Sequence, residues 1–149
     1  MIGDGKVIQL EAQLNSLPRF SSIIRQEHNL TKSPWSGYDK TTLKKAPNDT
    51  TIFAEKTFRN QITKSALDIG CGTGCDALYL LENGFNVKAL DQDHNAIEIL
   101  KQKIGKNYHD KDTYENTSIQ NFKIDSNAFD LINASFSLPF CSKADFKII

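Results

Sequence analysis

Residues 65–76 constrain the fold more than any other stretch of this 149-residue chain. An apolar run with one acid, residues 66–69, is followed by three of the chain's eight glycines, Gly70, Gly72 and Gly74. An amphipathic run begins directly after them. Glycine tolerates a positive φ and lets a ligand approach the main chain. The order therefore predicts a buried strand, a tight loop of bare backbone, and a helix whose N-terminus faces a ligand.

The alternation of elements continues after this loop. Residues 75–83 predict a helix that Gly84 ends, and residues 85–90 predict a second strand. Asp93 is a candidate N-cap for a further helix, which Gly105 ends. Strand, helix, strand and helix at this spacing indicate an α/β protein with a parallel sheet joined by right-handed crossovers. We therefore expect a Rossmann-like, doubly wound, mostly parallel sheet in three αβα layers.

Further elements are predicted on both sides of this unit. Residues 113–119 and 129–136 read as a third and a fourth strand. Upstream, Asn48 or Asp49 can cap a helix over residues 50–62. We expect its buried side to consist of Ile52, Phe53 and Phe58.

The chain is expected to divide into residues 1–64, a helical arm with a lid-like loop, and residues 65–149, the ligand-binding core. The first part has ten Lys and Arg against six Asp and Glu, and the second has eight against twelve. Two interpretations stay open. Either the asymmetry reflects solvated faces alone, or a basic arm lies across an acidic half that holds a cationic ligand. Trp35 and Tyr38 lie in the loop, which either anchors to the core or closes over a ligand.

Composition excludes several classes of protein. Hydrophobic residues make up 39% and charged residues 24%, and the net charge is zero, so nothing global favours nucleic acid or an anionic membrane. No basic and then apolar leader and no apolar run long enough to span a bilayer is seen. We therefore expect a cytoplasmic protein with free thiols at Cys71, Cys75 and Cys141. Two close thiols without a nearby third Cys or His make a poor zinc site, so no metal is expected.

The glycine loop discriminates between ligand classes. Dinucleotide-binding proteins require a further glycine one position after Gly74, where this chain has Cys75, followed by Asp76. An acid in the first turn would repel a phosphate, so the ligand is expected to carry none near the loop. Asp91 ends the second strand, 17 positions after Gly74, and a carboxylate there can accept both hydroxyls of a ribose.

These residues resemble a known family. Residues 67–74, Leu-Asp-Ile-Gly-Cys-Gly-Thr-Gly, closely resemble the first motif of the class I S-adenosylmethionine-dependent methyltransferases. Asp91 resembles that family's second-strand acid, and residues 129–136 resemble its fourth-strand motif. Residues 78–87 are most similar to the small-molecule and tellurite-resistance-type branch.

The resemblance implies a cofactor, S-adenosylmethionine, and a small-molecule methyl acceptor. It implies that Gly70, Cys71, Gly72 and Thr73 pack against the methionine part and that Asp68 orients the loop or binds the ammonium through water. It further implies that Asp91 holds the ribose. Four more implied contacts surround the adenosine or complete the site: Gln92, Ser118, Ile119 and Asn133. The catalytic base stays unassigned, since His94 and His109 read as structural or exposed.

The sequence also departs from the family. Ser118 stands where an acid is common. The family sheet has about seven strands and this chain supplies four, so we expect a sheet that is incomplete on its C-terminal side through an apparent truncation. A homodimer or a partner chain would then complete the sheet. A non-catalytic methyltransferase-like binding module is the alternative function, and Cys75 and Asp76 disfavour a nicotinamide-dependent oxidoreductase.

Overall fold

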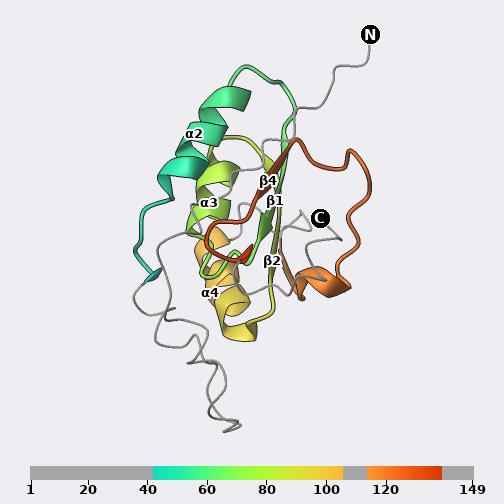
Figure 1. The fold of residues 1–149 in the computed structure, drawn as a ribbon. Helices are drawn as coiled ribbons and strands as arrows, with labels where there is room; N and C mark the ends of the chain where they lie inside the picture. The colour runs from blue at the N-terminus through green and yellow to red at the C-terminus, as the bar shows by residue number, and fades with distance from the viewer. Residues whose placement is uncertain (1–41, 106–113, 139–149) are drawn as a thin grey trace, which may run out of the picture.

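The computed structural model describes residues 42–105 and 114–138 of the chain. Four strands in these ranges form one parallel sheet in the order β3-β2-β1-β4. Three helices lie together on one side of it (Figure 1). The strands are β1 (Ser65–Ile69), β2 (Asn86–Asp91), β3 (Tyr114–Asn116) and β4 (Leu131–Asn133), and the helices are α2 (Asp49–Phe58), α3 (Cys75–Glu82) and α4 (His94–Ile104).

Side-chain alternation along β1 decides what each face of the sheet carries. Successive residues of a strand point to opposite faces. Ala66 packs in the cluster that includes α3 and α4, whereas Leu67 and Ile69 pack in a separate cluster on the other face. Asp68 shares the parity of Ala66, so its carboxyl points towards the helices. The one acid in the central strand is therefore buried on the helix side, at 2% exposure.

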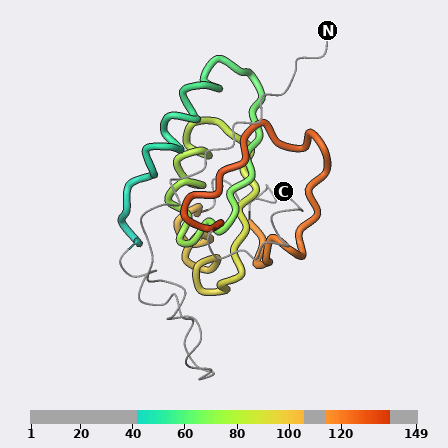
Figure 2. Tube along the Cα trace, viewed as in Figure 1, coloured from blue at the N-terminus to red at the C-terminus, as the bar shows by residue number. Residues whose placement is uncertain are grey.

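The second face of the sheet is covered by the chain that follows β3. Ile119 packs there against Leu67, Ile69 and Leu90. Figure 2 shows this segment, in orange, on the side of the sheet opposite to the helices. Within the described residues it contains one 3-10 helix, Ile119–Asn121. The expected Rossmann-like parallel sheet is confirmed.

The predicted buried side of α2 is wrong in part. The helix ends at Phe58, Phe53 is 63% exposed, and Ile52 is only half-buried. The residues that the helix buries are at helical spacing but half of them are polar: Thr51, Ala54, Glu55 and Phe58. Hydrophobicity alone therefore pointed to the wrong face of this helix.

Glu55 is tolerated in the interior because it is paired. Arg59 donates to its carboxylate at 3.1 Å, and the Tyr79 hydroxyl donates at 3.4 Å from α3. The hydrogen bond from Arg59 lowers the pKa of Glu55, more than burial raises it. The hydrogen bond from Tyr79 thus joins α3 to the buried Glu55 of α2, and the ion pair with Arg59 stays within the end of α2.

Three strand predictions need smaller corrections. Residues 129–136 form a strand only at Leu131–Asn133, because the chain turns at Ser135 and Phe136 has a φ of +61°. Among the described residues the third strand is Tyr114–Asn116 and does not continue to residue 119, and β2 begins at Asn86. Short strands suffice here because each is held by its neighbour in parallel register, Asp68 opposite Asn133 and Asp91 opposite Asn116.

We expect Phe58→Ala to destabilise the fold by about 3–5 kcal/mol, because it leaves a cavity in the core. It also removes an edge-to-face contact with Phe85 at 6.1 Å between ring centroids. The matched control is Phe53→Ala on the same helix, whose ring is exposed and whose loss should change the free energy of unfolding by less than about 0.5 kcal/mol. Urea unfolding followed by circular dichroism measures both. Equal losses would contradict the observed helix face.

Candidate functional site

Three glycines and two backbone hydrogen bonds fix the conformation of the loop between β1 and α3. Gly70, Gly72 and Gly74 have φ values of +67°, +53° and +81°, which favour glycine. The Cys71 amide donates to the Leu90 carbonyl at 2.9 Å, and the Gly74 amide donates to the Cys71 carbonyl at 2.9 Å. The predicted bare-backbone loop is confirmed as a conformation.

The three glycines have different surroundings. A Cβ atom on Gly74 would lie 2.1 Å from Cδ1 of Leu100 in α4, and one on Gly70 would lie 2.4 Å from Cβ of Ser137. Figure 2 shows the chain after β4 curling back beside this loop. A Cβ on Gly72 would meet nothing within 4 Å. Gly70 and Gly74 therefore permit close packing within the protein, whereas the backbone at Gly72 faces open space.

Asp91 lies at the end of β2, directly beside this loop. Its Oδ2 accepts the Gly72 amide at 2.8 Å, and its Oδ1 accepts the Asp93 amide at 2.8 Å. Burial raises the pKa of Asp91, while these backbone donors act in the opposite direction. Asp93 itself accepts the Asn95 amide at 2.9 Å, so its predicted role as the cap of α4 is confirmed.

A buried polar network underlies the loop, and Asn133 is its centre. The Asn133 amide nitrogen donates to Asp68 Oδ1 at 2.8 Å and to Asp76 Oδ2 at 3.3 Å. Its amide oxygen accepts the hydroxyls of Thr51 at 3.3 Å and Ser135 at 3.0 Å. The side chain joins β1, α2, α3 and the turn after β4, and all of its hydrogen-bonding groups are used within the protein.

Asp76 is also turned into the protein, where it meets the start of α2. Its two carboxylate oxygens accept the Asn48 backbone amide at 2.7 Å and the Asn48 side-chain amide at 2.8 Å. Asn48 precedes α2 as predicted, but its side chain makes no capping bond to that helix. The acid that sequence reasoning took to face a ligand is 6% exposed and anchors a neighbouring segment.

Asp68 has fewer donors than Asp76. Its Oδ2 is buried and has no hydrogen-bond partner among the described residues, and neither has Oγ of Ser137, which lies next to Gly70. Burial, and next the charge of Asp76, raises the pKa of Asp68 to about 8. An unpartnered carboxyl oxygen in a loop of bare backbone indicates a polar group that a ligand could satisfy.

A hollow of about 60 Å³ lies at this point, in front of the loop. Five of the ten predicted site residues line it, namely Asp68, Gly70, Cys71, Gly72 and Thr73. Sequence reasoning missed four polar lining residues, Thr42, Lys45, Asn48 and Ser135. No periodicity relates residues 42–48 to the loop, so the sequence carried no signal for them beyond the helix-start signature at Asn48.

The other five predicted residues fall into two groups. Asp91 and Asn133 do not line the hollow, but they hydrogen-bond to the loop and to Asp68. Gln92 is exposed, Ser118 precedes the 3-10 helix, and Ile119 is buried against the second face of the sheet. His94 is exposed at the start of α4. Among the other residues discussed above, four lie outside the described ranges: Trp35, Tyr38, His109 and Cys141.

Thr73 and Cys71 make contacts within the protein as well. The Thr73 hydroxyl donates to the Thr42 carbonyl at 3.3 Å, and the Lys103 ammonium donates to the Thr73 carbonyl at 2.8 Å. These bonds anchor the loop to α4 and to the chain before α2. Burial raises the pKa of the Cys71 thiol, which disfavours a reactive thiolate.

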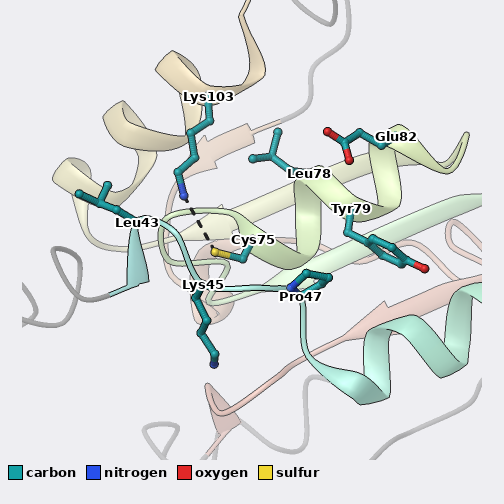
Figure 3. Close-up of a pocket in the computed structure, with 8 residues that line it drawn as sticks. All are labelled: Leu43, Lys45, Pro47, Cys75, Leu78, Tyr79, Glu82 and Lys103. Carbon is teal, nitrogen blue, oxygen red and sulfur yellow. Dashed lines mark hydrogen bonds between the residues drawn. The ribbon is translucent and has the colours of Figure 1, made fainter.

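A second, larger hollow of about 370 Å³ borders α3 (Figure 3). Its wall mixes apolar and charged side chains: Leu43, Lys45, Pro47, Cys75, Leu78, Tyr79, Glu82 and Lys103. The Lys103 ammonium lies 4.0 Å from the Cys75 sulfur, as the dashed line in Figure 3 marks. Lys45 and Cys75 line both hollows, so the two adjoin at residues 42–48.

Residues 42–105 and 114–138 contain neither a membrane-spanning helix nor a metal-binding cluster. No helix there is both long enough and apolar enough to cross a membrane. Within the same ranges, no group of three His, Cys, Asp or Glu side chains is arranged to hold a metal ion.

Residues 66–149, more than half of the chain, match the family described as "Methyltransferase domain". No curated protein matches the sequence. Among solved structures, a candidate S-adenosyl-L-methionine-dependent methyltransferase from Methanococcus maripaludis has a TM-score of 0.62 at 24% identity, over 81% of this chain and 60% of its own. At that identity the likeness shows the fold alone.

Two further structures are similar at 26% identity. TehB from Haemophilus influenzae has a TM-score of 0.50 and aligns over 65% of this chain and 32% of its own. A protein studied in the conversion of a disulfide bond into a thioacetal group during echinomycin biosynthesis has a TM-score of 0.55, over 69% and 42%. This chain thus spans 60% or less of the length of each of the three structures.

The glycines give a test of the loop. Gly72→Ala should cost about 1–2 kcal/mol, because only its positive φ opposes a side chain. Gly74→Ala should cost about 3 kcal/mol or more, because its Cβ also collides with buried Leu100. The measurement is urea unfolding of both variants, of Leu100→Ala and of the Gly74→Ala, Leu100→Ala double variant. The double variant should lose clearly less stability than the two single losses added, and simple additivity would contradict the contact.

Proposed function

The chain belongs to the methyltransferase domain family, and from this premise we propose that it binds S-adenosylmethionine and transfers the methyl group to a small molecule. The single observation that carries the proposal is the loop of residues 70–74. Its backbone is open at Gly72, and it is joined at Gly72 to the acid that ends the adjacent parallel strand. Ligands of open α/β sheets bind at the carboxyl ends of such strands.

The residues present fit this cofactor better than they fit a dinucleotide. The cofactor carries an ammonium, a sulfonium and one carboxylate, so that its net charge is positive, and it has no phosphate. Asp68 offers a buried oxygen without a partner, and Asp76 and Asp91 add acidic groups around the same loop. A pyrophosphate at this helix N-terminus would meet these carboxyls, whereas a cation is attracted by them.

Each proposed contact follows from the chemistry of one side chain. Asp91 would accept the ribose hydroxyls, since each of its oxygens accepts one backbone amide and retains a second lone pair. Gln92 would lie beside the adenosine, and Ser118 and Ile119 would flank the adenine. Asp68 would face the ammonium, while Gly70, Cys71, Gly72 and Thr73 would lie along the methionine part.

When bound, the cofactor supplies an electrophilic methyl group, and the contribution of the protein is mainly positioning. Thr73 is tied to α4 and Asp68 to Asn133, so the loop is held before a ligand arrives. We propose that the acceptor contacts Phe136, whose ring is 56% exposed at the hollow and lies 5.4 Å from the Lys45 ammonium. Of the described histidines, His94 is exposed, and we assign no base.

The proposal that the acceptor is a small molecule is supported by one similar structure. One of the two structures at 26% identity acts during echinomycin biosynthesis, which supports a small molecule as the acceptor. The tellurite-resistance-type branch stays a prediction from the sequence.

We predict that Asp91→Ala weakens the binding of S-adenosylmethionine at least about tenfold, because a charge-assisted hydrogen bond to a hydroxyl contributes about 1.5–3 kcal/mol. Isothermal titration with S-adenosylmethionine and S-adenosylhomocysteine measures this. Asp125→Ala, at an exposed position, is the matched control and should bind as the wild type does. Circular dichroism establishes that both variants are folded. Absence of heat from either ligand with folded wild-type protein would sink the proposed cofactor, and an unchanged affinity of Asp91→Ala would sink the ribose assignment.

A non-catalytic binding module is the second candidate, and the position of β4 favours it. Among the described residues, β4 pairs with β1 alone and so lies at an edge of the sheet, where a partner chain could add a strand. Formation of S-adenosylhomocysteine with a panel of amines, thiols and hydroxyl compounds separates the two functions. Turnover supports the transferase. Cofactor binding without turnover, together with a dimer by light scattering, supports the module.

A further inference from the structure

The two buried acids of the site, Asp68 and Asp76, accept hydrogen bonds from the same side-chain amide. Asp76 accepts more hydrogen bonds from other groups than Asp68 does. The Asn133 amide nitrogen donates to both of them, at 2.8 and 3.3 Å. Asp76 receives two more bonds, from the Asn48 backbone and side chain. The Ala77 backbone amide also acts on Asp68, and it lowers the pKa of that carboxyl less than Asn133 does. The Oδ2 atom of Asp68 has no partner among the described residues.

When two buried carboxyls share one site, the pKa of one of them is raised, because each charge raises the free energy of the other. The acid with more donors retains its charge, and the acid with fewer holds the proton. By this criterion Asp68, whose Oδ2 has no partner among the described residues, is the acid that holds the proton.

The other groups that face Asp68 reinforce this distribution. From β2, the negative charge of Asp91 adds to that of Asp76 and also raises the pKa of Asp68. The Cys71 thiol is neutral, since its own pKa is raised. Lys45 lines the same hollow, but its ammonium donates to Asn48 Oδ1 at 3.1 Å and lies over the Phe136 ring. No ion pair involving Asp68 occurs within the described residues.

We propose that Asp68 is a proton-linked recognition group. Its carboxyl is neutral in the free protein and releases its proton when the ammonium group of the cofactor's amino-acid end enters the hollow. The O–H bond breaks, the electron pair stays on the carboxylate, and the proton passes to the buffer. The charge of Asp76 keeps Asp68 neutral until then, and Asn133 positions the two carboxyls beside each other. This inference rests on the proposed function, because it takes S-adenosylmethionine as the ligand.

The proposal makes the affinity depend on pH in a definite direction. Below the pKa of Asp68, about 8, each ligand bound must displace a proton, so affinity falls as pH falls. The limiting slope is about tenfold per pH unit. Above about pH 8 the ligand's own α-amino group loses its charge, so affinity declines again. The expected profile of affinity is a bell with its maximum near the pKa of Asp68.

Isothermal titration of the full chain with S-adenosylhomocysteine tests this directly. At about pH 7, titrations in phosphate and in Tris should differ in enthalpy by an amount that corresponds to nearly one proton released. Binding with the same enthalpy in both buffers would overturn the proposal and leave the cofactor assignment standing. No binding in either buffer would overturn the proposed function itself, and this inference with it.

Three variants assign the proton to its residue. Asp68→Asn should release no proton and should lose the acid limb of the affinity profile. Asp76→Asn removes the neighbouring charge, so its acid limb should move to lower pH. Asp125→Asn, at an exposed position, is the matched control and should follow the wild type. Proton release that persists in Asp68→Asn would overturn the assignment.

A spectroscopic readout keeps the test independent of how well Asp68→Asn folds. An infrared difference spectrum of the wild type, with and without S-adenosylhomocysteine, should show the loss of one protonated carboxyl band on binding. Asp125→Asn should lose the same band on binding. Loss of no such band in the wild type would overturn the proposal.

Discussion

The site depends on two hydrogen bonds, which the Asn133 amide nitrogen donates to Asp68 and to Asp76. Parallel register places Asp68 directly opposite Asn133, so the two side chains emerge on the same face of neighbouring strands. The donor distance of 2.8 Å follows from that pairing. Because α3 begins immediately after the glycine loop, Asp76 is brought to the same amide. One neutral side chain thereby makes it possible to bury two carboxyls together.

Asn133 and Asp76 also bind the start of α2, which makes this helix part of the structure of the site. The Thr51 hydroxyl donates to Asn133, and Asn48 donates twice to Asp76. These bonds cross the expected division at residues 64 and 65. A helix that buries Thr51 and Glu55 gains little from apolar transfer at those positions, so its docking depends on partners in β4 and α3. The order of the helix and that of the loop are therefore linked through Asn133.

Local features of the fold could be predicted from the sequence, and distant polar contacts could not. The strand β1, the loop, α3 and α4 were predicted to within a residue or two, because alternation, glycine spacing and the Asp93 cap are written in consecutive residues. The role of Asp76 was missed, because its partner Asn48 lies 28 positions away and no periodicity connects them. For the same reason Phe53 was expected inside, although the helix turns Thr51 and Glu55 inward in its place. A polar residue with a buried partner looks the same in sequence as an exposed one.

The acids of the site indicate the charge of its ligand, which the glycines alone do not. Glycine loops before a helix suit anions, because the backbone amides and the helix dipole both attract negative charge. Here the first turn of the helix carries Asp76, and Asp68 and Asp91 lie on the adjoining strand ends. Three acids in a partly dry site repel an anion, and they also repel one another, so one of them stays neutral until a cation arrives. The shape of such a loop admits both a nucleoside attached to a phosphate and a nucleoside attached to a cation. The acids favour one attached to a positively charged group.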